Sequence, residues 1–120
     1  MKLYSLFLTC ADDKEADKIS KTLLNKKLIF CAKRFPVSSS FLWQGKITEG
    51  NEVLLIMDSI EENFEKIEKE ITRLHSYKTF VLLSTPVTKT TNRVKDWIKR
   101  EMNVQEISHR DEKDTIHFRH

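Results

Sequence analysis

The sequence of 120 residues is poor in the residues that build phosphate-binding loops and cysteine-rich metal sites, with two glycines, two prolines and two cysteines. Two glycines cannot form a Gly-x-Gly-x-x-Gly turn or a Walker loop. Cys10 and Cys31 lie 21 positions apart, which is not the Cys-x-x-Cys spacing of structural zinc. Neither a Gly-x-Ser-x-Gly nor a His-Glu-x-x-His motif occurs. These absences exclude the common nucleotide-binding and zinc-finger classes, and we expect no enzymatic activity.

Long apolar runs are also missing. No uninterrupted run is longer than Val53–Met57, whereas a membrane helix needs about 20 apolar residues. The N-terminal run Met1–Cys10 does not have the pattern of a secretory signal peptide, and a low cysteine content is typical of a reducing compartment. We therefore expect a soluble cytoplasmic protein with no membrane partner.

Basic and acidic residues nearly cancel, with 21 Lys and Arg against 18 Asp and Glu. The small surplus is shared by the two halves of the chain, so neither half forms a basic arm, and RNA-binding aromatic motifs are absent. We expect no nucleic-acid partner. The composition, 39% hydrophobic and 32% charged, is typical of one globular domain.

The first third of the chain predicts a strand followed by a helix. Leu3–Thr9 is apolar and aromatic and favours a buried strand. Asp12 with Glu15 three residues later matches a capping box. Apolar residues then recur at steps of three and four, which predicts a helix from about 13 to 26.

A β-hairpin is predicted next. Leu28–Ala32 favours a strand that Pro36 interrupts at an edge or a bend, and Phe41–Ile47 resumes extended structure. Thr48–Asn51 has the composition of a turn, and Glu52–Asp58 favours a buried strand. The last two strands would pair antiparallel across that turn.

The remaining pattern predicts a helix, a strand and a final helix. Ser59 and Glu62 match a second capping box before a helix that ends near Leu74. Thr79–Val87 favours a strand, and an apolar stripe from Val94 to Met102 predicts a helix capped near Thr91 or Asn92.

The order of the core elements, β-α-β-β-α-β, predicts an α+β ferredoxin-like split βαβ fold, with helices on one face of an antiparallel sheet. We place this domain at residues 1–102. The polar segment Asn103–His120 is predicted to be a frayed tail or an added edge strand.

Few residues carry recognisable chemistry. His75 closes the second predicted helix, where an imidazole either caps carbonyls or ligates a metal. Cys10 and Cys31 have the pattern of small core residues. His117-x-x-His120 either chelates a transition metal weakly or is solvated.

The segment Trp43-Gln44-Gly45-Lys46 predicts a bulge or a close backbone approach, because glycine follows tryptophan inside an expected strand. Two interpretations stay open. Either a sheet or a subunit packs there, or Trp43 and Lys46 line a pocket for an anionic ligand. Tyr77 could supply a phenol to the same neighbourhood.

Over residues 3–102 the sequence resembles the CutA divalent-ion tolerance family. The resemblance depends on the joint order of several landmarks rather than on any one of them. In chain order these are Leu8-Thr9-Cys10, Cys31, Trp43-Gln44-Gly45-Lys46, Glu52-Val53, His75-x-Tyr77, Leu83-x-x-Pro86-Val87 and Asp96-Trp97-Ile98. The family's His-Pro-Tyr run appears here as His75-Ser76-Tyr77.

The resemblance implies a ferredoxin-like homotrimer, similar in architecture to the PII signalling proteins. It also implies binding of copper or another divalent cation, with His75 as the first ligand candidate and Cys10 as the second. One alternative is a regulatory module that senses a small anionic ligand in a cleft between subunits, lined by Trp43, Gln44, Lys46 and Tyr77. Another is a trimeric scaffold that binds a partner protein through the tail 103–120.

Overall fold

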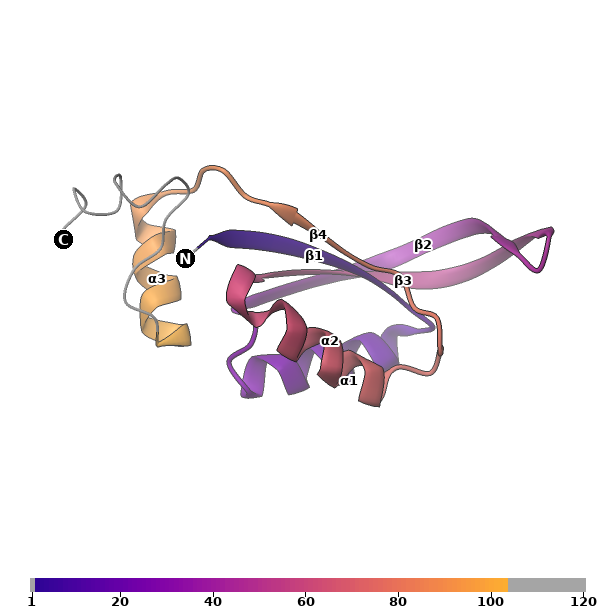
Figure 1. Ribbon diagram of the computed structural model, residues 1–120, viewed down its shortest axis with the longest axis horizontal. Helices are drawn as coiled ribbons and strands as arrows, with labels where there is room; N and C mark the ends of the chain where they lie inside the picture. The colour runs from indigo at the N-terminus through magenta and orange to yellow at the C-terminus, as the bar shows by residue number, and fades with distance from the viewer. Residues whose placement is uncertain (1, 104–120) are drawn as a thin grey trace.

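The computed structural model describes residues 2–103 of the chain. Within this range four strands, three α-helices and one 3₁₀ turn follow one another (Figure 1). In chain order they are β1 Leu3–Cys10, α1 Asp13–Asn25, β2 Cys31–Trp43, β3 Lys46–Ile60, the 3₁₀ turn Glu61–Asn63, α2 Phe64–Leu74, β4 Leu82–Pro86 and α3 Asn92–Met102. The predicted tail lies outside the described residues except for Asn103, which ends α3 in a left-handed conformation (φ 54°).

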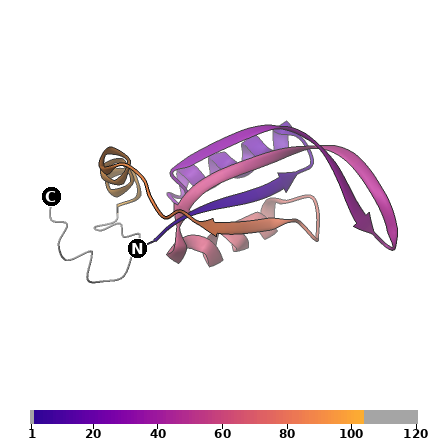
Figure 2. The same ribbon diagram turned by 90° about the horizontal axis from the view of Figure 1, so that it is seen from above.

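The strands form one antiparallel sheet in the order β2-β3-β1-β4. Helices α1 and α2 lie side by side on the same face of this sheet, whereas α3 lies beyond its end, near the start of β1 (Figures 1 and 2). The predicted α+β ferredoxin-like arrangement is therefore confirmed. No helix in residues 2–103 is long and apolar enough to cross a bilayer.

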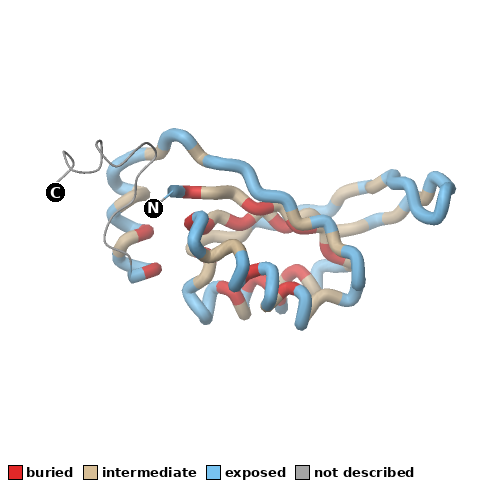
Figure 3. Tube along the Cα trace, in the orientation of Figure 1, coloured by how far each residue is buried: buried red, intermediate tan, exposed pale blue. Residues whose placement is uncertain are grey.

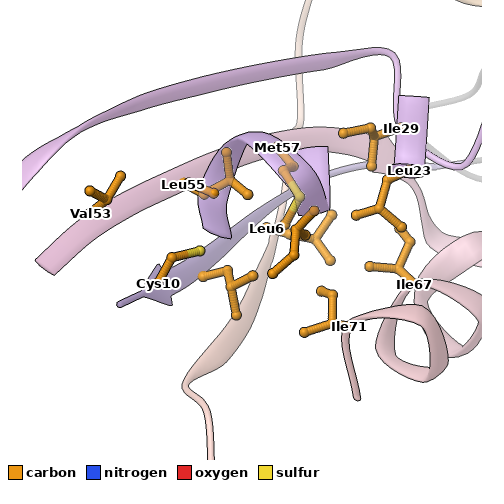
Figure 4. Packing of buried hydrophobic residues seen from close by; sticks show 12 residues of the cluster. Leu6, Cys10, Leu23, Ile29, Val53, Leu55, Met57, Ile67 and Ile71 are labelled. Atoms are coloured by element: carbon orange, nitrogen blue, oxygen red, sulfur yellow. The ribbon is translucent and has the colours of Figure 1, made fainter. Parts of the chain in front are cut away.

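The main core lies between the sheet and the helix pair, and the red segments of Figure 3 trace it along the facing sides of these elements. Alternate residues of β1 and β3 point to this layer, as the period of two in a strand requires. Figure 4 shows the same layer from close by. Its fully buried members are Leu6, Leu8, Cys10, Ala16, Ile19, Leu23, Leu55, Met57, Ile67 and Ile71.

The opposite face of the sheet has no helix over it within the described residues (Figure 2). Strand pairing places Phe7 beside Ile56 and Leu83 on this face, and Leu54 beside Phe35 one row further on. Phe35 is 45% exposed and Leu83 60% exposed. We call these five residues the open face.

The hairpin between β2 and β3 turns at Gln44 and Gly45, not at the predicted Thr48–Asn51. Both central residues have positive φ, 52° and 80°, as in the two-residue turn that matches the twist of paired strands. Thr48–Asn51 lies inside β3. The predicted bulge at Gly45 was wrong for the same reason, because this glycine makes the turn.

The predicted break at Pro36 was also wrong, because β2 runs unbroken from Cys31 to Trp43. Pro36 pairs with Val53 on an edge strand of the sheet, where proline is tolerated, so the predicted edge position is confirmed. The strand begins at Cys31 rather than Leu28, because the Leu28 N–H donates to the Leu23 carbonyl of α1 at 2.9 Å. Cys31 itself is half-buried on the side of the open face rather than a core residue.

Seven residue pairs of this hairpin extend past β1. β1 pairs with β3 only as far as Val53, so residues 37–43 and 46–52 pair with each other alone. We call residues 37–52 the hairpin arm; it is the two-stranded projection on the right of Figure 1. The molecule measures 52 × 27 × 22 Å along its principal axes.

The second predicted capping box was wrong. Ser59 is buried, and its hydroxyl donates to the carbonyl of Leu28, as does the side-chain amide of Asn63 at 3.1 Å. A 3₁₀ turn therefore precedes α2, which begins at Phe64.

The last strand and the last helix are closer to prediction. β4 covers Leu82–Pro86 and is shorter than the predicted Thr79–Val87. The start of α3 is confirmed, because Thr91 Oγ1 accepts a hydrogen bond from the Val94 N–H at 3.3 Å.

Candidate functional site

Three potential ligand side chains converge where β1 ends. Cys10 is the last residue of β1, Glu15 lies in the first turn of α1, and His75 follows α2. One ligand atom of each lies within 4.8 Å of those of the other two. We call these three residues the β1-end group.

Glu15 is held in the group by main-chain donors. Asp12 Oδ1 accepts the Glu15 N–H at 2.8 Å and fixes the start of α1, as predicted. Glu15 Oε1 accepts the N–H of Ala11 at 2.8 Å, and Oε2 accepts the N–H of Ser76 at 2.7 Å. Burial would raise the pKa of Glu15, but these donors outweigh it and hold the pKa below its usual value. The carboxylate therefore stays charged and joins α1 to the segment after α2.

The His75 ring bridges two segments of main chain. Nδ1 accepts the N–H of Tyr77 at 3.0 Å, so Nε2 carries the ring proton and donates it to the carbonyl of Thr9 at 2.8 Å. The ring also stacks on Phe80, with centroids 5.3 Å apart, and the side chain has no exposed surface. The interpretation of His75 as a side-chain cap for the carbonyls of α2 was therefore wrong.

Cys10 is fully buried in the main core, which confirms the prediction of a core residue. Burial raises the pKa of its thiol to about 12, and the carboxylates of Glu15, Asp12 and Glu52 add to this. At neutral pH the thiol is protonated, whereas metal ligation and nucleophilic attack both need the thiolate.

The residues of the β1-end group do not fit a divalent cation as they are arranged. Thiol, carboxylate and imidazole are suitable ligand types for copper or zinc. The lone pair of His75 Nδ1 is used by Tyr77, both oxygens of Glu15 accept main-chain N–H groups, and Cys10 keeps its proton.

The same three residue types also serve as nucleophile, base and orienting group in cysteine hydrolases. In that arrangement an imidazole nitrogen takes the proton of the thiol. Here neither ring nitrogen of His75 is free to do so, and Cys10 has no exposed surface. The geometry therefore does not activate Cys10.

Tyr77 extends the polar contacts toward the base of the hairpin arm. Its hydroxyl donates to Glu52 Oε2 at 2.8 Å, and its ring lies 4.8 Å from that of His75. Burial, together with the Glu52 carboxylate, raises the pKa of Tyr77 to about 12. The sequence did not predict the tertiary contacts of Glu15, Ser76 and Glu52. Of these three residues, only Glu15 was marked by a local pattern, the capping box with Asp12.

The other proposed ligand-binding residues lie elsewhere. Trp43, Gln44 and Lys46 form the tip of the hairpin arm. Lys46 is six residues along β3 from Glu52, the partner of Tyr77, which is about 20 Å in a strand. One chain therefore does not bring the tip and Tyr77 into one pocket.

A second polar cluster lies at the opposite end of the sheet, beside the open face. Lys33 Nζ donates to Cys31 Sγ at 3.2 Å and lies 3.7 Å from Asp58 Oδ2. Ser5 Oγ donates to Asp58 Oδ1 at 2.7 Å. The contact with Cys31, together with Asp58, raises the pKa of Lys33. A cavity of about 230 Å³ is lined both by residues of this cluster and by Trp97 of α3.

Comparison with known proteins gives a consistent result. The sequence model of the CutA1 divalent ion tolerance protein family matches residues 4–101. A divalent-cation tolerance protein CutA from Archaeoglobus fulgidus is 34% identical over 93 residues, which cover 78% of this chain and 91% of that protein. The corresponding protein from Thermotoga maritima is 26% identical over 97 residues, covering 81% of this chain and 96% of that protein.

Solved structures agree with the sequence comparison. The structure of the periplasmic divalent cation tolerance protein CutA from Archaeoglobus fulgidus superposes with a TM-score of 0.81 at 32% identity, covering 83% of this chain and 98% of that one. CutA1 from Pyrococcus horikoshii superposes with a TM-score of 0.78 at 28% identity, covering 82% and 96%.

Proposed function

Because this chain belongs to the CutA1 divalent ion tolerance protein family, we propose that it acts as a homotrimer in the tolerance of divalent cations and catalyses no reaction. The observation that carries the assembly is the open face. The observation that supports a role without catalysis is the protonated, buried state of Cys10 beside His75.

The open face supports assembly because it exposes a contiguous apolar surface. Its five residues lie in adjacent rows of four strands, and no described helix covers them. Monomeric proteins seldom leave such a patch in water. Copies of the chain that pack these faces together would bury Phe35 and Leu83, which are 45% and 60% exposed.

The hairpin arm supports the same proposal. An isolated two-stranded hairpin is only marginally stable in water, yet this arm has large apolar side chains on both of its faces. Leu42 and Ile47 are each 76% exposed on one face, and Phe41 and Trp43 are 42% and 51% exposed on the other. A neighbouring copy that receives the arm would stabilise it.

The sheet edges favour a ring over a two-fold dimer. The free edges belong to β2 and β4, which differ in length and sequence. Joining one kind of edge to the other is a head-to-tail contact, and such contacts form a ring when the rotation between copies closes. Three copies are the number that the family resemblance implies.

The native mass tests the assembly. We expect light scattering to give three times the chain mass of 14.2 kDa. Leu83→Glu places a charge on the open face and should give monomers. Leu24→Glu is the matched control, because Leu24 lies on the solvent side of α1 and is 39% exposed; this variant should stay trimeric. A monomeric wild-type protein would contradict the proposal.

We extend the proposal to weak binding of copper or another divalent cation. Its support is that the relatives from Archaeoglobus fulgidus and Thermotoga maritima are divalent-cation tolerance proteins. Titration calorimetry with Cu²⁺ and Zn²⁺, and with Mg²⁺ as a control, tests it. Heats indistinguishable from dilution for all three ions would overturn this part and leave the assembly untouched.

A second candidate is a small anionic ligand held between copies. The tip of the arm offers the half-exposed ring of Trp43 beside Lys46, and Tyr77 is 36% exposed at the base of the arm. An arm that reaches a neighbouring copy could bring the two together. A thermal-shift screen with nucleotides and organic anions tests this, because ligand at 100 times its Kd adds about 2.7 kcal/mol of stability. A flat screen contradicts it.

We place this function in the cytoplasm. Both cysteines are free thiols, and Cys31 is only half-buried beside Lys33. Free thiols persist in reducing compartments. Cell fractionation tests the location, and recovery from the periplasm, as described for the Archaeoglobus fulgidus structure, would correct it.

A further inference from the structure

We propose that the β1-end group is an internal fastening, which ties the segment 75–81 to β1 and α1, and that it is not the place where a divalent cation binds. The second half of this inference builds on the proposed cation binding, whereas the first half stands on the contacts within one chain.

The His75 ring joins two segments that are 66 residues apart. It accepts from the Tyr77 N–H and donates to the Thr9 carbonyl, so one imidazole satisfies two main-chain groups. A cation at Nδ1 would take the lone pair that the Tyr77 N–H uses, and a cation at Nε2 would displace the ring proton. The first event leaves the Tyr77 N–H without this acceptor, and the second leaves the part-buried Thr9 carbonyl without its donor.

Glu15 repeats this bridging from the helix side. Its two oxygens accept from Ala11 and from Ser76, which belong to the end of β1 and to the segment after α2. Its side chain is 11% exposed, and Oε1 lies 3.6 Å from His75 Nδ1. A carboxylate that accepts two main-chain N–H groups is already compensated, and it gains less from a cation than a free one would.

Cys10 completes the group by packing rather than by ligation. It belongs to the same buried cluster as Val53, its partner on β3. The raised thiol pKa means that a cation at this sulfur must first expel a proton. The fold uses Cys10 as a small apolar residue.

The segment 75–81 lies between α2 and β4 and belongs to neither. It therefore needs side-chain contacts to hold it in place. One main-chain bond ties its end to the sheet, from the Thr9 N–H to the Val81 carbonyl at 3.4 Å. The stacking of Phe80 on His75 and the bond from Tyr77 to Glu52 both depend on where this segment lies. The group therefore sets the path of the chain into β4.

The first experiment separates fastening from ligation. Co²⁺, Cu²⁺ and Zn²⁺ are titrated into the wild-type trimer and into Cys10→Ala, with Cys31→Ala as the matched control. We expect no cobalt–thiolate absorption from Cys10 and cation affinities within about twofold of wild type in Cys10→Ala. A tenfold loss in Cys10→Ala with none in Cys31→Ala would overturn the inference and leave the proposed cation binding intact.

A wild-type protein that binds none of the three ions gives a different result. It would end the proposed cation binding and agree with the inference that the β1-end group holds no cation. The two failures are thus distinguishable in one titration series.

The second experiment tests the fastening through amide hydrogen exchange in the segment 75–81. His75→Asn keeps an acceptor near the Nδ1 position, and His75→Gln keeps a donor near the Nε2 position. We expect exchange at the Tyr77 N–H to rise about tenfold in His75→Gln and less in His75→Asn, because only the latter retains an acceptor. Lys78→Ala, an exposed change in the same segment, should leave it unaltered.

Equal exchange at Tyr77 in wild type and His75→Gln would overturn the fastening. If His75→Gln fails to fold, Glu15→Gln supplies the same test at Ser76, since it weakens the acceptor of that N–H. Unchanged exchange at Ser76 in that variant would count against the fastening in the same way.

Discussion

The two faces of the sheet are built from the same strands and differ in almost everything else. On β3 the side chains alternate, so that Leu55 has no exposed surface under the helix pair while Leu54 and Ile56 are only partly buried on the open face. The first face is complete within one chain. The second is apolar, and no element of the described chain covers it.

The residues of the covered face specify the fold of the single chain, and those of the open face support the proposed assembly. Residues under α1 and α2 stabilise the single chain by leaving water on folding. Residues of the open face contribute their full hydrophobic free energy only when a second surface covers them. The β1-end group lies at the border, because its Cys10 points to the covered face, while Glu52 belongs to the alternate set of β3 residues and accepts a hydrogen bond from Tyr77.

The largest expected effect comes from truncating neighbouring leucines on β3. Leu55→Ala leaves a cavity in the completed core and should lower the free energy of unfolding by about 2–5 kcal/mol. Denaturant unfolding measures this, and the loss should not depend on protein concentration.

Leu54→Ala is the matched variant, with the same chemical change one residue away. It should cost less in the dissociated chain, and its effect should grow with protein concentration, because the proposed assembly would bury this side chain. Equal losses at every concentration for both variants would break the comparison between the two faces.

The order of elements could be predicted from the sequence because it depends on local signals. The alternation in β1 and the apolar stripes of the helices are periodic, and Asp12 and Thr91 are N-caps that act within three residues. The hairpin turn was missed because Gln44 is not a typical residue for positive φ, although Gly45 was a usable signal. Ser59 was misassigned because its hydroxyl found a partner 31 residues away.

The candidate site could be predicted only in part. Cys10 and His75 were singled out by type, yet their meeting with Glu15 depends on the packing of α1 against α2, which joins residues 60 or more positions apart. Two main-chain groups, the Thr9 carbonyl and the Tyr77 N–H, determine the role of His75. Main-chain groups are present at every residue, so no side-chain pattern marks them.

An intermediate effect is expected at the border between the faces. Glu15→Gln should lower the free energy of unfolding at pH 7 by about 1.5 kcal/mol, because a charged acceptor of two N–H groups becomes neutral. The folded pKa of Glu15 lies below its usual value of 4.5. Its contribution is therefore present above pH 4.5 and is lost as the pH falls through the folded pKa.

Denaturant unfolding of wild type and Glu15→Gln between pH 7 and pH 3 checks this. The two stabilities should converge at the acid end, where both side chains are neutral. Asp13→Asn is a suitable control, because Asp13 is in the same turn of α1 and its side chain is 80% exposed. A constant gap between wild type and Glu15→Gln across the range would contradict the role given to this carboxylate.

The smallest effects are expected in the hairpin arm, which belongs to neither face of the four-stranded part. Gly45→Ala should cost about 1 kcal/mol, because a Cβ is strained at φ 80° although nothing lies within 4 Å of it. Gly50→Ala is the matched change inside β3, where the backbone is not left-handed and the space is also open. It should stabilise by about 0.5 kcal/mol, since alanine has less freedom to lose than glycine. Thermal unfolding measures the change in stability of both variants. Changes of opposite sign would show that the conformation of the Gln44-Gly45 turn limits the arm. Changes of equal sign would mean that neighbouring copies, and not this turn, determine the shape of the arm.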